Sequence, residues 1–268
     1  MGDLKHYVIR GGAEGRERLR ILSRVMHAST TSLFNRLGVT DGMDCLDFGC
    51  AGGDVTLELA RRVGPGGKVL GADLDATKIE LARREAAELG IGNVEFRVHD
   101  IREYRPAAEF DVVYARFLLT HLPDPAGAVA ALHGSLRPGG LLVVEDIDCS
   151  VPCAFPESRA TRRYYALYCA AARRRGADPE IGPRLPLLLK DCGFTNVEMS
   201  VVQPMGLEGE VKLMAPLTME TIGGTVVHDG LASREEVAAL VAELYALAEN
   251  PRVLVGMPRV VQAWGRRP

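Results

Sequence analysis

Short apolar runs alternate with helix-like segments over the first half of the chain. The runs that we expect to form strands lie at residues 44–48, 68–73, 94–100, 111–116 and 141–147. The segments between them are typical of helices, as at residues 76–89 and 127–136. This alternation indicates βαβ units, and therefore a parallel sheet with helices on both faces.

The pattern is looser at both ends of the chain. A stripe of apolar residues predicts a helix over residues 16–26, and a second helix is predicted to follow Thr30 and to stop at Gly38. Later elements are expected as helices at 157–175 and 183–192, a strand at 196–203 and a final strand at 253–265. The long excursion between these two strands contains apolar helical stretches, which are more typical of a lid than of a structureless loop.

These elements predict an α/β fold with a seven-stranded, mostly parallel, doubly wound sheet. They also divide the chain into four expected segments: an N-terminal helical cover (1–40), the α/β core (41–205), a helical lid insertion (206–252) and the final strand of the core (253–268).

Composition narrows the classes of protein to which the chain can belong. Its 268 residues are 47% hydrophobic and 25% charged, as in ordinary globular proteins. A formal net charge of −3 disfavours a broad basic face for nucleic acid. The six cysteines are scattered without a CxxC pair, which predicts reduced thiols and no zinc site. The sequence shows neither a signal-peptide pattern nor an apolar run of the ~18–20 residues that a membrane span needs. We therefore expect a cytoplasmic protein with no nucleic-acid or membrane partner.

The sharpest motif is LDFGCAGG, at residues 46–53, on a predicted strand-to-helix turn. Its glycines let the backbone approach a ligand, and the helix beyond offers unpaired N–H groups. Nicotinamide-dependent oxidoreductases share such a turn. However, Asp47 would lie beside a pyrophosphate, Asp54 replaces the last glycine of GxGxxG, and no obvious Tyr-x-x-x-Lys pair is present. A carboxylate at the strand tip suits a ligand with positive charge, and an oxidoreductase is kept as the alternative.

Two further carboxylates end neighbouring predicted strands. Asp73 closes KVLGAD, where an acidic side chain can accept hydrogen bonds from both hydroxyls of a ribose. Asp100 closes VEFRVHD, where it could accept a hydrogen bond from the amino group of an adenine beside Ile101. Together with Asp47, both would stand at the carboxyl edge of the sheet, where open α/β sheets bind ligands. Asp75 directly precedes a helix, and we expect it to be a plain N-cap.

Five segments resemble, in order and spacing, the motifs of class I S-adenosylmethionine-dependent methyltransferases. They are DCLDFGCAGGDVTLELA, GADLD, VEFRVHDI, FDVVYARFLLTHLPDP and LRPGGLLVVEDI, and together they cover residues 41–150. The resemblance implies a Rossmann-like core, S-adenosyl-L-methionine as the cofactor and transfer of its methyl group to an acceptor.

The resemblance also assigns roles to individual residues. The methionine part of the cofactor would be surrounded by Asp47, Gly49, Cys50, Ala51 and Gly53, with Ala51 in place of the family's central glycine. The ribose would be held by Asp73, and the adenine would meet Leu74, Asp100 and Ile101.

Other assignments concern the two ends of the cofactor. Tyr7 and Arg18 resemble a leading segment that closes over the cofactor's carboxylate, and an Arg fork suits that group. Arg116 ends the fourth predicted strand, close to the expected place of the sulfonium. The candidates for a general base are Tyr7, His121 and His6, in that order.

The acceptor is expected to be a small, fairly apolar metabolite. The resemblance is greatest to bacterial secondary-metabolite and quinone-pathway enzymes, which makes aromatic or indole-like acceptors plausible. In the lid, Met214, Leu217 and Met219 are predicted to roof the acceptor pocket. No metal is implied, because the fourth strand ends in Tyr114-Ala115-Arg116, where the metal-dependent catechol enzymes keep a carboxylate. A monomer or a homodimer fits these features, and a cofactor-binding module without turnover is a second alternative.

Overall fold

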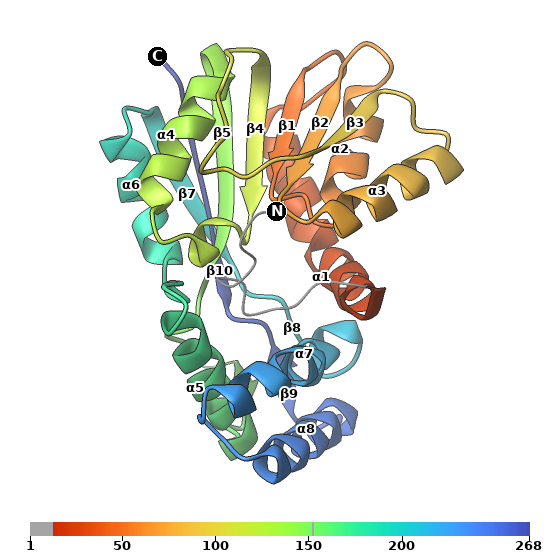
Figure 1. Ribbon diagram of the computed structural model, residues 1–268, viewed down its shortest axis with the longest axis vertical. Coiled ribbons are helices and arrows are strands. Elements are labelled where there is room, and N and C mark those ends of the chain that lie inside the picture. Colours follow the sequence, from red (N-terminus) through yellow and green to blue (C-terminus); the bar gives the residue numbers. More distant parts are fainter. Residues whose placement is uncertain (1–12, 152) are drawn as a thin grey trace.

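The computed structural model describes residues 13–151 and 153–268 (Figure 1). Its centre is a seven-stranded sheet in the order β3-β2-β1-β4-β5-β10-β7. The strands are β1 (Cys45–Phe48), β2 (Val69–Asp73), β3 (Val94–Val98), β4 (Phe110–Arg116), β5 (Leu136–Asp148), β7 (Thr195–Val202) and β10 (Arg259–Arg266). The first five are parallel, and β10 runs antiparallel between β5 and β7. The predicted mostly parallel, doubly wound sheet is confirmed.

Helices cover both faces of the sheet because successive side chains on a strand point in opposite directions. Leu46 and Phe48 of β1 face α4 (Pro125–Ser135) and α6 (Leu185–Asp191). Cys45 faces the other way, toward α2 (Asp54–Val63) and the second half of α1 (Ala13–Leu37). On that second side, α3 (Ala76–Glu88) packs on Phe96 of β3.

The described part of the N-terminal cover, from residue 13 on, contains one helix, so the prediction of two helices between residues 16 and 38 was wrong. Ser29 and Thr30 could have capped a second helix, but their hydroxyls are used otherwise. Ser29 donates to the carbonyl of Met26 at 2.9 Å, and Thr30 donates to buried Glu145 at 3.2 Å. Neither hydroxyl competes for the helical N–H groups, and α1 therefore continues to Leu37.

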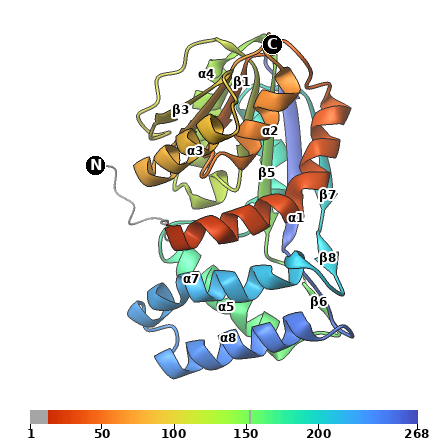
Figure 2. The same cartoon turned by 90° about the vertical axis from the view of Figure 1, so that its right-hand side faces the viewer.

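A second layer of helices, here called the helical layer, lies below the carboxyl ends of the parallel strands (Figures 1 and 2). It consists of α5 (Arg159–Arg173), α7 (Met214–His228) and α8 (Arg234–Glu249), which share one buried apolar cluster. The apolar stripe of α8, with Leu240 and Leu244 fully buried, packs on α5 and α7 rather than on the sheet. The layer therefore includes α5, although its residues fall within the predicted core segment 41–205.

The predicted final strand is split between two sheets. Its first part is β9 (Leu254–Gly256), which pairs with β6 (Ala154–Phe155) and β8 (Met205–Gly206) in a small three-stranded sheet. Only the part after Pro258 joins the main sheet, as β10.

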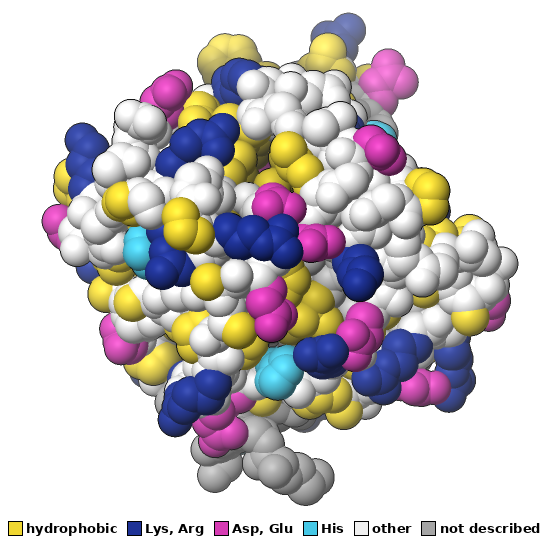
Figure 3. All heavy atoms as spheres, turned by 90° about the horizontal axis from the view of Figure 1, so that it is seen from above, with side chains coloured by type: hydrophobic (Ala, Val, Ile, Leu, Met, Phe, Trp, Pro, Cys, Tyr) yellow, Lys and Arg dark blue, Asp and Glu magenta, His cyan; other side chains and the backbone are white. Residues whose placement is uncertain are grey.

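The surface carries charges of both signs, as the near-balance of acidic and basic residues in the sequence predicts. Basic and acidic side chains are interspersed on the face seen from above (Figure 3). No helix in the described part of the chain combines the length and the apolar character needed to span a bilayer. The six cysteines are all free thiols.

A buried lysine fastens the helical layer. Lys212, in the short helix η4 (Glu210–Leu213) before α7, has an exposed fraction of 1%. Its ammonium donates to the carbonyl of Leu207 at 2.9 Å and to that of Asn250, just beyond α8, at 2.6 Å. These two bonds join the entry of α7 to the end of α8.

We predict that Lys212→Met lowers the free energy of unfolding by about 3 kcal/mol or more, since it removes two charged hydrogen bonds of roughly 1.5–3 kcal/mol each, while the methionine stem keeps most of the packing. Urea unfolding measures this. Lys190→Met, at an exposed position of α6, is the matched control and should change stability by less than about 0.5 kcal/mol. Equal stability of the two variants would contradict the role given to the ammonium.

Candidate functional site

Two adjoining cavities open at the carboxyl ends of β1 to β4. The larger cavity lies between the Gly-rich loop after β1, the end of β4 and the helices α1, α5 and α7. The smaller cavity lies beyond the ends of β2 and β3. Gly49 and His121 line both cavities, so one elongated ligand can occupy the two together.

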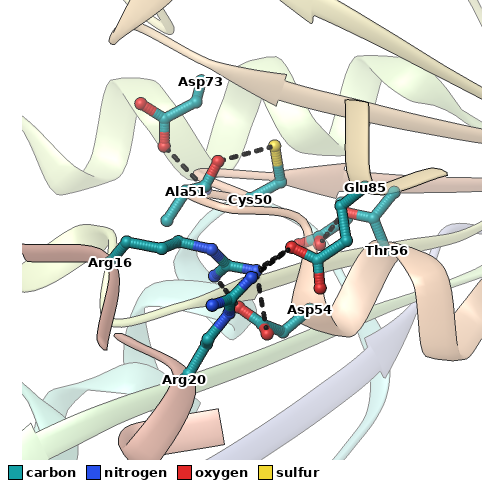
Figure 4. A network of polar contacts seen from close by, with 9 residues as sticks. Arg16, Arg20, Cys50, Ala51, Asp54, Thr56, Asp73 and Glu85 are labelled. Carbon is teal, nitrogen blue, oxygen red and sulfur yellow. Dashed lines mark hydrogen bonds and ion pairs between the residues drawn. The ribbon is translucent and has the colours of Figure 1, made fainter. Parts of the chain in front are cut away.

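Asp73 holds the Gly-rich loop from one side. Its carboxylate accepts from the backbone N–H of Ala51 (Figure 4) and from that of Asp75, each at 2.9 Å. The loop turns through positive φ at Gly49, Ala51 and Gly53, with values of 81°, 48° and 83°. Asp75 caps α3 by accepting from Thr77 and Lys78, which confirms its predicted role as an N-cap.

Arg16 of α1 holds the loop from the other side (Figure 4). Its guanidinium donates to Asp54 at 2.5 Å and to Glu85 at 2.6 Å. It lies so close to Gly52 that a Cβ atom there would come within 2.2 Å of Nη1. Sequence reasoning missed Arg16, because its two partners are distant in the chain. Asp54 is 38 positions away and Glu85 is 69 positions away, so no local sequence pattern predicts these ion pairs.

Asp47 is a buried carboxylate at the tip of β1. It has an exposed fraction of 2% and accepts from Thr56 Oγ1 at 2.6 Å. Burial raises the pKa of Asp47 to about 6, although the Thr56 hydrogen bond and the charge of Arg116 oppose this shift. Among the described residues no cation lies within ion-pair distance of it, so a ligand with positive charge would complete its environment.

A buried polar network supports the end of β4. Glu145 accepts from Tyr114 at 2.5 Å, from Thr30 at 3.2 Å and from Gln262 at 2.8 Å. Arg116 donates to Thr30 at 3.1 Å and lines the larger cavity. Burial lowers the pKa of Arg116, but the charges of Tyr114, Glu145 and Asp47 outweigh this effect and raise the pKa overall.

Phe117, the residue directly after β4, has an unusual backbone conformation that sets the direction of its ring. Phe117 adopts φ 53°, a strained value for a side chain of this size, and its N–H donates to the carbonyl of Glu145 at 2.8 Å. This geometry directs Phe117 to the wall of the larger cavity.

Asp146 shapes the turn that carries His121. It accepts from the N–H of Thr120 and of Ile147, each at 2.9 Å, and burial raises its pKa to about 7. Neither Glu145 nor Asp146 lines either of these two cavities. Burial, with the charges of Lys78 and Arg18, lowers the pKa of His121 to about 4, so its ring is neutral at pH 7.

The smaller cavity contains the residues predicted to meet an adenosine. Asp73, Leu74, Asp100 and Ile101 all line it. Asp100 pairs with Arg102 at 2.5 Å, which lowers the pKa of its carboxyl and keeps it ionised. The structure adds apolar walls and an imidazole that sequence reasoning missed, from His99, Leu118 and Leu122.

An aromatic wall closes the far side of the larger cavity. Tyr164, Tyr165 and Tyr168 of α5 line it, and α7 contributes Met214, Ala215 and Thr218. Sequence reasoning missed the tyrosines as site residues, although Tyr164 and Tyr168 are four residues apart and therefore share a helix face.

The predicted site residues divide into those that line the larger cavity and those that lie elsewhere. The larger cavity receives Arg18, Asp47, Gly49, Cys50, Ala51, Arg116, His121 and Met214. Leu217 and Met219 were expected in its roof, but they do not line it and pack instead in the apolar clusters behind its wall. Gly53 lies behind the loop, where a Cβ would meet the Phe96 ring at 2.9 Å. His6 and Tyr7 lie outside the described residues. Within the described residues, no group of three or more His, Cys, Asp or Glu is arranged to hold a metal ion.

A family model and the curated relatives both identify the chain as similar to methyltransferases. A family model described as a methyltransferase domain matches residues 39–184. Nocamycin O-methyltransferase of Saccharothrix syringae is 41% identical over 100 residues, which cover 37% of this chain and 36% of that protein. The chain spans less than half the length of the curated relatives that it matches.

Solved structures give the fold. A Bacillus halodurans protein assigned as a methyltransferase has a TM-score of 0.62 at 18% identity, covering 90% of this chain and 99% of that one. The [4+2]-cyclase SpnF has a TM-score of 0.56 at 18% identity, covering 89% and 80%. Because a cyclase shares the architecture, the fold alone does not decide the reaction.

The left-handed conformation of Ala51 gives a prediction about stability. Ala51→Gly should raise the free energy of unfolding by about 1 kcal/mol, because an alanine Cβ is crowded at positive φ and glycine is not. Ala242→Gly, on the exposed face of α8, is the control and should lower it by about 1 kcal/mol. Chemical denaturation that finds both variants destabilised would show that the loop carries no strain at Ala51.

Proposed function

The chain belongs to the class I S-adenosylmethionine-dependent methyltransferases, whose domain model matches residues 39–184, and on that premise we propose that it methylates a small-molecule acceptor. The observation that carries the proposal is the pair of joined cavities, one bounded by Asp73 and Asp100 and the other by the buried carboxylate of Asp47. The first suits an adenosine, and the second suits the positively charged end of the cofactor.

The residues fit S-adenosylmethionine at each part of the molecule. Asp73 would accept from the ribose hydroxyls, with Leu74, Asp100 and Ile101 around the adenine. Gly49, Cys50 and Ala51 would bring the backbone close to the methionine part, and Asp47 would face its positive charge. When bound, the cofactor supplies an activated methyl group on a sulfonium.

The chain's own contribution is positioning, exclusion of water and proton transfer. The helical layer and α1 enclose the space beyond the loop, which favours a fixed approach of the acceptor. His121 lies at the junction of the two cavities, and its ring is neutral at pH 7. A pKa of about 4 makes it a weak base, so it would serve an acceptor whose own proton becomes acidic as the methyl group is transferred. His121 is therefore the base candidate that the described site supports.

The acceptor proposed is a fairly apolar metabolite, aromatic or indole-like. Support comes from the three tyrosines and from Phe117 and Met214 in the wall of the larger cavity. The similarity to nocamycin O-methyltransferase favours secondary metabolism as its setting. A cytoplasmic monomer or homodimer remains our expectation.

Calorimetric titration with S-adenosylhomocysteine and with NADH tests the class of cofactor. We expect binding of the first and none of the second, and the reverse would favour an oxidoreductase. Incubation with methyl-labelled S-adenosylmethionine and a bacterial small-metabolite extract then tests turnover. Labelled small molecules support an enzyme, whereas tight cofactor binding with no label transferred would favour a binding module or another reaction.

Asp73 provides a direct test of the ribose site. Asp73→Ala should weaken S-adenosylhomocysteine binding by about 1–3 kcal/mol, the range for hydrogen bonds to a charged group. Asp75→Ala, which removes the N-cap of α3 on the same turn, should lower stability by about 1 kcal/mol and leave affinity within about twofold. Equal affinity losses in the two variants would assign Asp73 to loop structure alone.

Asp47 gives a pH dependence with a defined sign. Its pKa is about 6 without ligand, and a cationic ligand favours the ionised carboxylate, so binding releases a proton below that pH. Affinity for S-adenosylmethionine should therefore fall as pH drops below about 6, by at most tenfold per pH unit.

Two variants test whether the pH dependence of binding comes from Asp47 or from another titratable group. Asp47→Asn should bind more weakly at pH 7.5 and lose the dependence. Thr56→Val removes the hydrogen bond that lowers the pKa of Asp47, so its affinity should begin to fall at a higher pH. A dependence that persists unchanged in Asp47→Asn would belong to another residue.

A further inference from the structure

Two arginines of α1 have opposite environments. Arg16 is paired with Asp54 and Glu85 on the side of the Gly-rich loop. Arg18, two residues later, points to the other side and lines the larger cavity. In the described part of the chain no carboxylate lies within ion-pair distance of Arg18, and burial lowers its pKa without such a partner.

The hydroxyl of Thr218 fixes the direction of the Arg18 side chain. Its Nε donates to Thr218 Oγ1 at 3.0 Å, and that hydroxyl donates to the carbonyl of Met214 at 2.6 Å. The Tyr164 side chain lies near both Thr218 and Arg18. The two terminal nitrogens of Arg18 make no hydrogen bond with any described residue, so the fork of the guanidinium is held in place and is available to a ligand.

We propose that Arg18 binds an acidic group, a carboxylate, on the methyl acceptor. A half-buried cation is stabilised by a paired anion, and the planar fork of Arg matches a carboxylate through two parallel hydrogen bonds. This inference rests on the proposed methyl transfer and adds a charged group to the fairly apolar acceptor described above.

The position of Arg18 favours the acceptor over the cofactor's own carboxylate, which the sequence analysis had assigned to it. Its polar neighbours, Thr218 and Tyr164, belong to the helical layer. Arg116, in contrast, lies at the end of β4 and is influenced by the charges of Asp47 and Asp54. Arg116 is therefore better placed for the methionine end, and Arg18 for a molecule that lies against the tyrosines.

Apolar side chains surround the same part of the cavity. Leu19, Leu22 and Met214 line it together with Tyr168 and Ile147. A ligand that fits has an apolar or aromatic body and one acidic end, which Arg18 would orient relative to the methyl group.

The first experiment identifies which carboxylate Arg18 meets. S-adenosylhomocysteine and 5′-methylthioadenosine, which lacks the amino-acid part, are titrated into wild type and Arg18→Gln. We expect Arg18→Gln to bind both within about twofold of wild type. A selective loss of S-adenosylhomocysteine by tenfold or more would assign Arg18 to the cofactor and overturn the proposal.

The second experiment measures charge recognition in the acceptor space. The probes are 4-hydroxyphenylacetate and its neutral amide, titrated into the protein saturated with S-adenosylhomocysteine. We expect the acid to bind wild type at least tenfold more tightly, consistent with a hydrogen bond to a charged group, and Arg18→Gln to lose that preference. The exposed neighbour Arg20→Gln is the matched control and should keep it.

A second variant covers the case in which Arg18→Gln is unstable, and the following results would contradict the proposal. If Arg18→Gln does not fold, Thr218→Val keeps the charge but removes the partner of Nε, and the preference for the acid should fall several-fold. Equal affinity for acid and amide in wild type, no binding of the acid, or a preference that survives both variants overturns the proposal. A wild-type protein that binds no S-adenosylhomocysteine would instead overturn the proposed function.

Discussion

The Asp73 carboxylate is the constraint on which the site depends. By accepting from the N–H of Ala51 and of Asp75, it joins the loop after β1 to the loop after β2. Two neutral donors cannot satisfy all the acceptor sites of a carboxylate, so Asp73 can still bind a ligand hydroxyl while it fixes the backbone. Arg16 closes the opposite side of the loop and brings α1 with it. Asp73 and Arg16 act on the same loop, so the shape of the site and the placement of the helical cover depend on each other.

The sequence was sufficient to predict the sheet and the carboxylates at its edge. Period and spacing identified β1 to β5, and parallel strands bring their carboxyl ends to one edge, so Asp47, Asp73 and Asp100 had to lie near one another. The N-cap role of Asp75 was equally predictable, because it depends on residues two and three positions away.

What the sequence did not predict depends on contacts between distant segments. The continuity of α1 requires Glu145 to receive the Thr30 hydroxyl, 115 residues away. The aromatic wall requires α5 to leave the sheet and join α7 and α8, a choice that helical spacing alone does not reveal. The same limit explains Leu217 and Met219, because an apolar helix turned slightly about its axis presents different residues to the cavity.

The place of β10 in the sheet has a consequence for how the protein is made. The first contact of β5 with this strand joins Asp148 to Arg259, 111 residues later, and β7 also pairs with β10. During synthesis every other strand emerges earlier, so β5 keeps an open edge, and β7 has no neighbour, until α7 and α8 have been translated. The helical layer and the sheet are therefore completed together, and a nascent chain that stalls before β10 exposes an unpaired strand edge, the kind of surface on which chains aggregate.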